Sequence, residues 1–189
     1  MPPLDRYPKE IALKDGAQVS LRPMVPEDAG LLWEFLQRIP HEEKMYFRED
    51  VSDRDEVNRW AAAIDYASAL PILAVFEGRV VGNATLHRNR TGWKQRVGTV
   101  RILIDPEFRH RGLGTAMIRE LRHLGDKASL RYLLAEMTEE QQAAVRAFEK
   151  LGFERIAVLR KYVNDQKGNM HNLVVLLHSM SDEDDETFY

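Results

Sequence analysis

The first third of the chain shows two patterns of apolar and polar positions, one typical of strands and the other of helices. Short apolar runs flank an Asp-Gly pair at Asp15-Gly16, which predicts a β-hairpin. Pro26, followed by two acidic residues, is typical of the first turn of a helix. Apolar residues then recur at helical spacing, namely Leu31, Leu32, Phe35, Leu36 and Ile39. The polar segment 52–55 predicts the start of a second helix.

The remaining pattern predicts six further strands and two further helices. The expected strands cover residues 72–77, 80–88, 97–104, 132–137, 155–163 and 171–180. The expected helices cover residues 115–127 and 141–151, and Gly152 closes the second of these helices. The predicted order is therefore ββααβββαβαββ, which is typical of an α+β fold with a central mixed sheet and helices on its faces.

The length of 189 residues suits one domain, which we place at residues 1–180. Residues 181–189 form an acidic segment, which we expect to be a flexible tail. Removing its five carboxylates from the net charge of −3 leaves about +2, which is not the strongly basic balance of a general nucleic-acid binder.

A local cluster of basic residues offers one alternative to that conclusion. Cationic residues on one turn and its adjoining strands resemble a basic β-ribbon: Arg88, Arg90, Lys94, Arg96 and Arg101. Aromatic residues that could stack on bases amount to Trp93 alone, so we expect no nucleic-acid partner.

The sequence also lacks several other signals. It has no apolar run near the roughly 20 residues that span a bilayer, and no apolar signal-peptide core, so we expect a cytoplasmic protein without membrane contact. The absence of cysteine excludes disulfides and thiolate nucleophiles. The six histidines do not show the HExxH spacing of a zinc site, and there is no G-x-S-x-G motif. We therefore expect chemistry without a metal or a covalent enzyme intermediate.

The most informative stretch is the junction between the strand 97–104 and the helix that follows it. The apolar run ends at Asp105-Pro106 and is followed by Arg109-His110-Arg111-Gly112-Leu113-Gly114. A glycine-rich turn at a helix N-terminus exposes backbone N–H groups that bind anions, and arginines add charge-assisted hydrogen bonds to phosphate. The P-loop and Rossmann motifs fit poorly, because Thr115-Ala116 replaces Lys-Ser/Thr and Met117 replaces a glycine or alanine.

This junction resembles the signature of the GNAT superfamily of N-acyltransferases, Arg/Gln-x-x-Gly-x-Gly/Ala after an apolar strand. A second block of the family is similar to residues 135–153, which end in Leu151-Gly152-Phe153. The resemblance extends over roughly residues 19–177 and implies the GNAT fold, with a mixed, mostly antiparallel sheet. Within the superfamily, the segments at Lys14-Asp15-Gly16 and Leu21-Arg22-Pro23 look most like the catalytic domain of bacterial protein-lysine acetyltransferases.

The resemblance implies acetyl-CoA, or another short acyl-CoA, as cosubstrate. In the family the signature loop wraps the pyrophosphate, which here falls to His110, Arg111, Gly112, Leu113, Gly114 and Thr115, with Arg109 beside them. The strand segment Ile102-Leu103-Ile104 resembles the one that pairs with the pantetheine arm. A backbone N–H near Leu103 or Ile104 is then expected to stabilise the oxyanion formed from the thioester carbonyl.

The second block supplies a general base and two departures from the family. Glu136 aligns with the acidic position beside the acetyl site, whereas the central strand, the other usual place for an acid, offers Thr99 and Arg101. Gln141 stands where many members hold the pantetheine with an Asn. Phe148 replaces the Tyr that protonates the leaving thiolate in many members, which leaves the general acid unassigned.

The acceptor is expected to bind near the first two helices and the final hairpin. Acidic residues at 41–44 and 49–56 are typical of a solvated face, but they favour a cationic acceptor if they line the cleft. We expect direct acetyl transfer to a primary amine, either a protein lysine, an N-terminus or a small molecule, by a monomer or a homodimer. The alternative is a non-catalytic acyl-CoA-binding module, which the replacement at Phe148 would fit.

Overall fold

The computed structural model describes residues 5–44, 51, 53–165 and 167–180. Its eight strands form one sheet in the order β1-β2-β3-β4-β5-β6-β8-β7. The strands are β1 (Lys9–Ala12), β2 (Gln18–Pro23), β3 (Ala69–Phe76), β4 (Arg79–Arg88), β5 (Val97–Ile104), β6 (Tyr132–Thr138), β7 (Glu154–Asn164) and β8 (Met170–Ser179). The pairing of β5 with β6 is parallel, and the other neighbouring pairs are antiparallel.

The helices follow the predicted order, with one addition. They are α1 (Ala29–Arg38), α2 (His41–Lys44), α3 (Arg54–Ala62), α4 (Leu113–Lys127) and α5 (Gln142–Glu149). The prediction of an α+β fold with a mixed, mostly antiparallel sheet is confirmed. The short polar helix α2 was not expected, because four residues carry too little periodicity to be recognised. Helix α1 also begins three residues later than Pro26, because residues 26–28 form a 3₁₀ turn.

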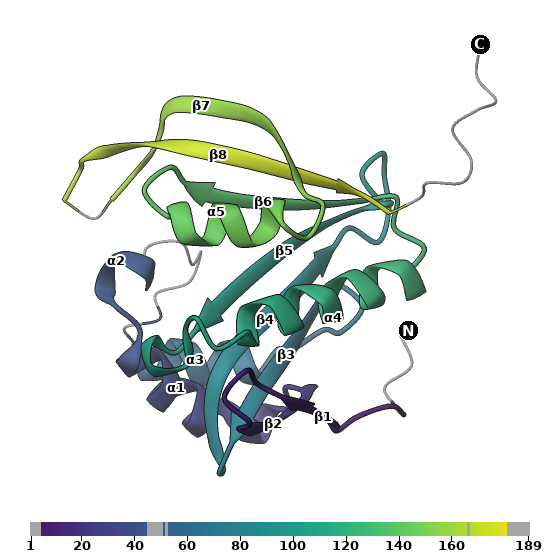
Figure 1. The fold of residues 1–189 in the computed structure, drawn as a ribbon, viewed down its shortest axis with the longest axis vertical. Coiled ribbons are helices and arrows are strands. Elements are labelled where there is room, and N and C mark those ends of the chain that lie inside the picture. The colour runs from purple at the N-terminus through teal and green to yellow at the C-terminus, as the bar shows by residue number, and fades with distance from the viewer. Residues whose placement is uncertain (1–4, 45–50, 52, 166, 181–189) are drawn as a thin grey trace.

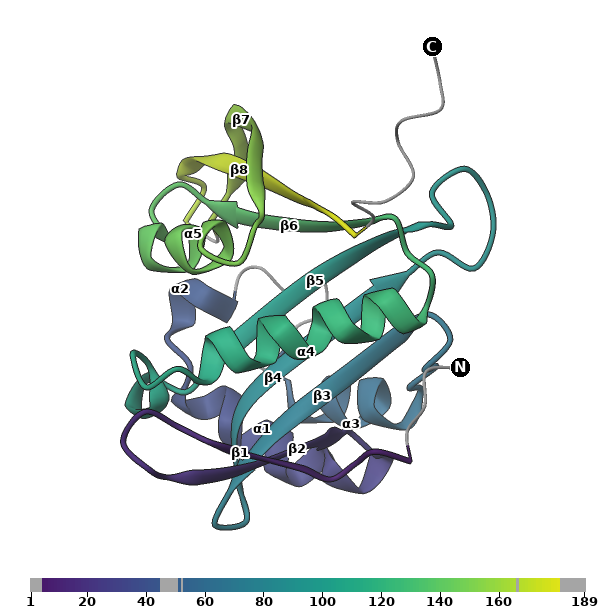
Figure 2. The same ribbon diagram turned by 45° about the vertical axis from the view of Figure 1, so that its right-hand side comes forward.

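Helices cover both faces of the sheet (Figures 1 and 2). Helix α4 lies across one face, where Met117, Leu121 and Leu124 are buried against β4 and β5. Helices α1 and α3 lie on the other face, where Leu32 and Phe35 pack with Val57 in a second, smaller core. Burying each of these side chains stabilises the fold by about 1.5–3 kcal/mol, which fixes the helices against the sheet.

The sheet divides near its centre. Strands β5 and β6 are paired only between Val97–Val100 and Tyr132–Ala135. Beyond that point β5 continues beside β4 as far as Ile104, while β6 continues beside β8 as far as Thr138. Figure 2 shows β6, β7 and β8 turning away with α5 from the rest of the sheet. The end of β5 therefore has a free edge in the middle of the molecule.

Candidate active site

The free edge of β5 presents the main chain of two residues. The N–H of Asp105 donates to the carbonyl oxygen of Val81 on the β4 side at 3.0 Å. N–H groups alternate between the two edges of a strand, so the N–H of Leu103 also faces β4. The N–H groups of Ile102 and Ile104 therefore face the gap between β5 and β6. This edge can hydrogen bond an extended molecule lying in the gap.

The corner after β5 is held by Asp105, which is 1% exposed. Its carboxylate accepts from the N–H of Glu107 at 3.1 Å and so caps the short turn that Pro106 begins. The other carboxylate oxygen accepts from Nε of Arg38, at the end of α1, at 2.6 Å. The Asp-Pro pair in the sequence accounts for the cap, and the ion pair fastens α1 to this corner.

The glycine-rich turn leads directly into the N-terminus of α4. Gly112 has φ +93° and precedes Leu113, the first helical residue. This left-handed conformation favours glycine, while a Cβ there would lie in ordinary contact with the side chain of Lys14, at 3.4 Å. The first helical hydrogen bond ends at Gly112, from the N–H of Ala116 at 3.1 Å. No side chain caps the helix, so the N–H groups of Leu113, Gly114 and Thr115 are available to an anion.

Both arginines of the signature loop are already paired with carboxylates. Nη2 of Arg109 lies 2.8 Å from Oε1 of Glu43 in α2, and Nε and Nη2 each donate to the carbonyl oxygen of Ile104 at 3.2 Å. Arg111 pairs with Asp15 of the first hairpin, and its guanidinium lies 4.4 Å above the ring centroid of Phe108. The hydrogen bond from Arg111 lowers the pKa of Asp15 below its usual value. The two arginines thus fasten the loop to α2 and to the first hairpin.

The remaining predicted loop residues divide by exposure. His110 is exposed and has φ +61°, a left-handed conformation that is uncommon outside glycine. The side chain of Leu113 is completely buried in the larger core, so only its main chain can meet a ligand. Gly114 has room for a methyl group, because the nearest atom, Cγ1 of Ile104, would lie 3.8 Å away. This agrees with the Gly/Ala alternative of the sequence signature.

Glu136 lies on β6, one residue beyond the last pairing with β5. Its side chain is exposed. Its neighbours Ala135 and Met137 point into the larger core with α5, so Glu136 points to the opposite face of β6. Glu136 therefore begins the unpaired part of β6, and its carboxylate lies on the face of the strand opposite α5, open to solvent.

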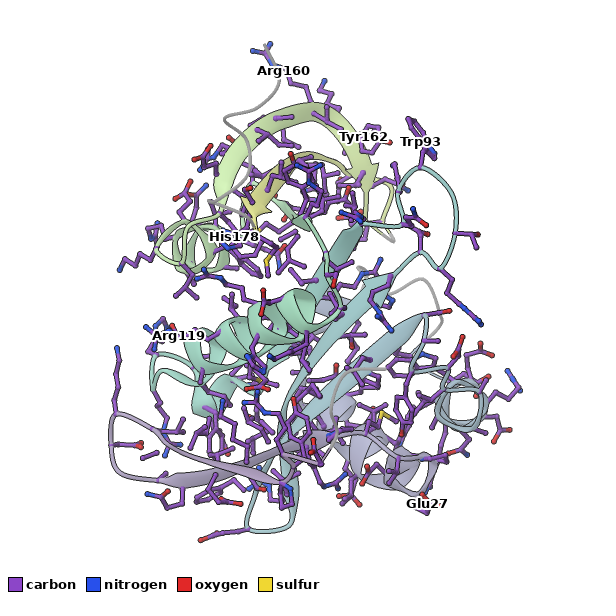
Figure 3. The ribbon with its side chains drawn as sticks, turned by 90° about the vertical axis from the view of Figure 1, so that its right-hand side faces the viewer. Glu27, Trp93, Arg119, Arg160, Tyr162 and His178 are labelled. Carbon is purple, nitrogen blue, oxygen red and sulfur yellow. The ribbon has the colours of Figure 1, made fainter. Side chains whose placement is uncertain are left out.

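Gln141 and Phe148, the other two residues singled out in the second block, make structural contacts within the protein. Oε1 of Gln141 accepts from the N–H of Thr138 at 3.0 Å, so it closes the turn between β6 and α5. Phe148 is 5% exposed and packs edge-to-face on Phe153, with ring centroids 4.9 Å apart. A direct contact of either residue with a cosubstrate stays a prediction. Tyr162, a tyrosine of the final hairpin, is 64% exposed and lies on the outer strand β7 (Figure 3).

Three carboxylates of the acidic segments 41–44 and 49–56 have partners among the described residues. Glu43 pairs with Arg109, Asp53 caps α3 by accepting from Asp55 N–H at 2.9 Å, and Glu56 pairs with Arg59. Glu49 and Asp50 lie outside the described residues, as does the acidic segment 181–189. Whether these segments line an acceptor cleft therefore stays a prediction.

In the part of the chain that the structure describes, no three side chains of His, Asp or Glu gather closely enough to hold a metal ion. Nor does any helix in it have the length and apolarity needed to cross a membrane.

Comparison with known proteins agrees with this geometry. Residues 33–153 match the acetyltransferase (GNAT) family. The chain is 26% identical over 127 residues to the L-amino acid N-acetyltransferase AaaT of Escherichia coli K12, an alignment that covers 66% of this chain and 70% of that protein. It is 28% identical over 76 residues to the E. coli K12 enzyme that acetylates an alanine of ribosomal protein bS18, covering 40% of this chain and 51% of that enzyme.

A solved structure shows the same fold. YncA of Salmonella typhimurium, solved with its cofactor acetyl-CoA, superposes with a TM-score of 0.74 at 17% identity. The superposition covers 88% of this chain and 96% of YncA. With the divided sheet and the glycine turn at the start of α4, these matches show that the chain belongs to the GNAT family and is an acetyl-CoA-dependent N-acetyltransferase.

Proposed function

We propose that this enzyme transfers the acetyl group of acetyl-CoA directly to the primary amine of an amino acid or a polypeptide. The main observation behind this proposal is the free edge of β5, which ends at the uncapped N-terminus of α4. An extended cosubstrate with an anionic group at one end matches that arrangement. The class of acceptor is suggested by the two curated relatives, one of which acts on L-amino acids and the other on a protein alanine.

The pyrophosphate is assigned to the main chain at the start of α4. The N–H groups of Leu113, Gly114 and Thr115 lack helical partners and lie at the positive end of the helix dipole. Gly112 allows a ligand to approach the backbone closely. Arg109 and Arg111, which are paired with acids, are assigned mainly to holding this turn in place.

The reacting end of the cosubstrate is assigned to the edge of β5. The N–H groups of Ile102 and Ile104 face the gap, so they are better placed than that of Leu103 to hydrogen bond the arm and the thioester carbonyl oxygen. The carbonyl oxygen of Ile104 is held by Arg109, which fixes the next peptide, between Ile104 and Asp105, at the end of this edge.

Glu136 is assigned as the general base. A lysine amine with a pKa near 10.4 is almost fully protonated at neutral pH, and only the neutral amine attacks a thioester. An exposed carboxylate at the start of the unpaired part of β6 can accept the proton, directly or through water. CoA leaves as a thiolate, and thiols are acidic enough (a cysteine side chain has a pKa near 8.5) for transfer to proceed without an assigned general acid.

The test is a turnover assay with acetyl-CoA and a panel of amines. The panel contains a free L-amino acid, a peptide with an N-terminal alanine, an N-terminally blocked lysine peptide, and a polyamine. We expect release of CoA thiol, matched by acetylated product, with one of the first three acceptors. Tight binding of acetyl-CoA without turnover on any amine would overturn the proposal, and turnover on the polyamine alone would overturn the acceptor class.

A further inference from the structure

A second group of arginines lies at the opposite end of the sheet from the signature loop. The loop between β4 and β5, residues 89–96, joins Arg88 to Val97 and contains Arg90, Lys94 and Arg96 but no carboxylate. Figure 3 shows Trp93 on this loop, which extends beyond the sheet, and the side chain of Trp93 is 95% exposed. The N-acetyltransferase activity gives this concentration of positive charge no role.

The arginines surround a hollow of about 460 Å³. It is lined by Arg88, Arg90 and Arg96, together with the polar side chains of Gln95 and Ser129. This volume lies within the roughly 300–1,000 Å³ of small-molecule sites. The residues that line the hollow include no carboxylate, so its electrostatic potential favours an anion.

Arg88 is fixed in position and yet incompletely bonded. Its backbone N–H donates to the carbonyl oxygen of Ser68 at 2.7 Å, and its Nη2 donates to that of Tyr66 at 3.2 Å. Its Nε is buried and has no hydrogen-bond partner among the described residues. Because Nε is shielded from solvent, a ligand in the hollow would meet the rest of the guanidinium, which lines it, and charge-assisted hydrogen bonds to that group are strong.

The other two arginines are also available. Within the described residues, neither Arg90 nor Arg96 forms an ion pair with a carboxylate. The nearby Asp65 is occupied by hydrogen bonds from Ser68 and from the N–H of Ala67. Those bonds, with a smaller contribution from Arg90 and Arg88, lower the pKa of Asp65. One paired carboxylate does not balance three guanidinium groups.

The hollow is separate from the proposed CoA loop. Residues 128–130, which line it, follow the last turn of α4, whereas Gly112 precedes the first turn. Helix α4 has 15 residues, and at 1.5 Å per residue the two ends are about 22 Å apart.

We infer that the hollow bounded by Arg88, Arg90 and Arg96 is a second anion site, which binds a small molecule carrying a phosphate group. Planar guanidinium groups suit the oxygens of phosphate, and three of them converge on one hollow. A nucleic acid is less well matched, because the loop offers one exposed aromatic residue and the net charge is −3.

Calorimetric titration with inorganic pyrophosphate and with AMP tests this site, using full-length protein saturated with CoA so that the signature loop is filled. We expect one further bound ligand per chain. The double substitution Arg88→Gln, Arg96→Gln should weaken its affinity at least about tenfold, equivalent to about 1.4 kcal/mol, because charge-assisted hydrogen bonds to the ligand are lost. The matched control is Arg119→Gln with Arg160→Gln, two exposed arginines on α4 and β7 (Figure 3), and it should bind as wild type.

Because Arg88 also holds the Tyr66 segment, a second variant changes only exposed side chains, Arg90→Gln with Arg96→Gln. Unaltered CoA affinity shows that each variant is folded, and acetyl transfer reports separately on the proposed function. The inference is overturned if neither ligand binds, or if both double variants bind it as wild type does. It is also overturned if affinity for single-stranded DNA rises steadily with strand length, which would indicate a nucleic-acid surface.

Discussion

The two ends of helix α4 are both rich in arginine, but they use it in opposite ways. At the N-terminal end, Arg109 and Arg111 are each paired with a carboxylate, and the groups left available to an anion are main-chain N–H groups. Around the C-terminal end, Arg88, Arg90 and Arg96 line a hollow without any carboxylate, and the available groups are guanidinium groups. The number of arginines alone would not distinguish the two ends.

The difference separates two ways of recognising phosphate. A backbone site is positioned by the fold, so it depends on Gly112 and on the ion pairs that hold the loop. A side-chain site depends on charge that has not been neutralised, so it should respond strongly to salt. Four substitutions test the backbone site at the N-terminal end of α4, the proposed base on β6, the middle of the helix, and the pairing of Arg109.

The largest effect is expected from Gly112→Asp. A carboxylate among the N–H groups at the start of α4 competes with and repels the pyrophosphate, and the left-handed backbone adds strain. We expect CoA affinity to fall at least about 100-fold, equivalent to about 2.7 kcal/mol, measured by calorimetry. Gly112→Asn, which is neutral and tolerates this conformation, should lose much less. If the Gly112→Asp variant bound CoA as tightly as wild type, the start of α4 would not be the pyrophosphate site.

A smaller effect, confined to turnover, is expected from Glu136→Gln. Without a base the enzyme depends on amine that is already neutral, so kcat should fall about 10–100-fold at pH 6.5 and progressively less toward pH 9. CoA affinity should not change, because Glu136 is on β6, away from the start of α4. The control is Glu154→Gln on β7, which is also exposed. A pH profile parallel to that of wild type would remove Glu136 from the mechanism.

A change in the middle of α4 should alter stability and leave both ends intact. Glu120 is 1% exposed and accepts from Nζ of Lys9 at 2.7 Å and from the Tyr7 hydroxyl at 2.6 Å. Burial acts to raise the pKa of Glu120, but these hydrogen bonds outweigh it and the pKa is lowered. We expect Glu120→Gln to lower the free energy of unfolding at pH 7 by about 2 kcal/mol in urea titrations.

The pH dependence of that loss has a definite sign. A carboxyl with a lowered folded pKa stabilises the protein above its ordinary value of about 4.3, and the contribution disappears as the pH falls through the folded pKa. The difference between wild type and Glu120→Gln should therefore be complete at pH 7 and shrink below about pH 4. Glu56→Gln, which breaks an exposed pair with Arg59, should leave the free energy of unfolding almost unchanged. A pH-independent difference would assign the loss to packing.

The smallest effect is expected from Glu43→Gln, which gives the N-terminal end an unpaired arginine like those at the other end. Both side chains of the Glu43–Arg109 pair are partly exposed, so breaking it should cost little stability. Freed Arg109 should raise CoA affinity about threefold at low salt, with a steeper salt dependence. Glu34→Gln, an exposed change on α1, should have no effect. Weaker binding would show instead that Glu43 holds Arg109 in its productive position.

Local signals in the sequence were sufficient for most of the fold. The Asp-Gly turn, the Asp-Pro corner and the glycine at position 152 lie where the predicted elements begin or end, because each acts through its own backbone geometry. The anion-binding turn was also readable, since Gly112 determines it locally. The separation of β5 from β6 was not readable, because it depends on how two halves of the sheet twist against each other.

The ion pairs of the signature loop could not be predicted from the sequence either, because they join residues that are far apart along the chain. Arg109 finds its partner 66 positions away and Arg111 finds its partner 96 positions away, so no local pattern could show that these charges are neutralised. Phe148 aligns with a family position beside the cosubstrate, and its contact with the cosubstrate stays a prediction; what the sequence did not show is its packing against Phe153. The hollow at the far end required both the 89–96 loop and the segment after α4 to meet in space.

Because β5 separates from β6, the backbone amides at the end of this central strand should exchange their hydrogens with solvent as those of an edge strand do. Along residues 101–104, the amide protons of Arg101 and Leu103 are shielded by β4, whereas those of Ile102 and Ile104 are not covered by β6. Protection from solvent exchange therefore alternates residue by residue in the interior of the sheet. Without its cosubstrate, the protein contains an edge where a continuous sheet would have none, and a molecule that lies along it completes the sheet without being a peptide.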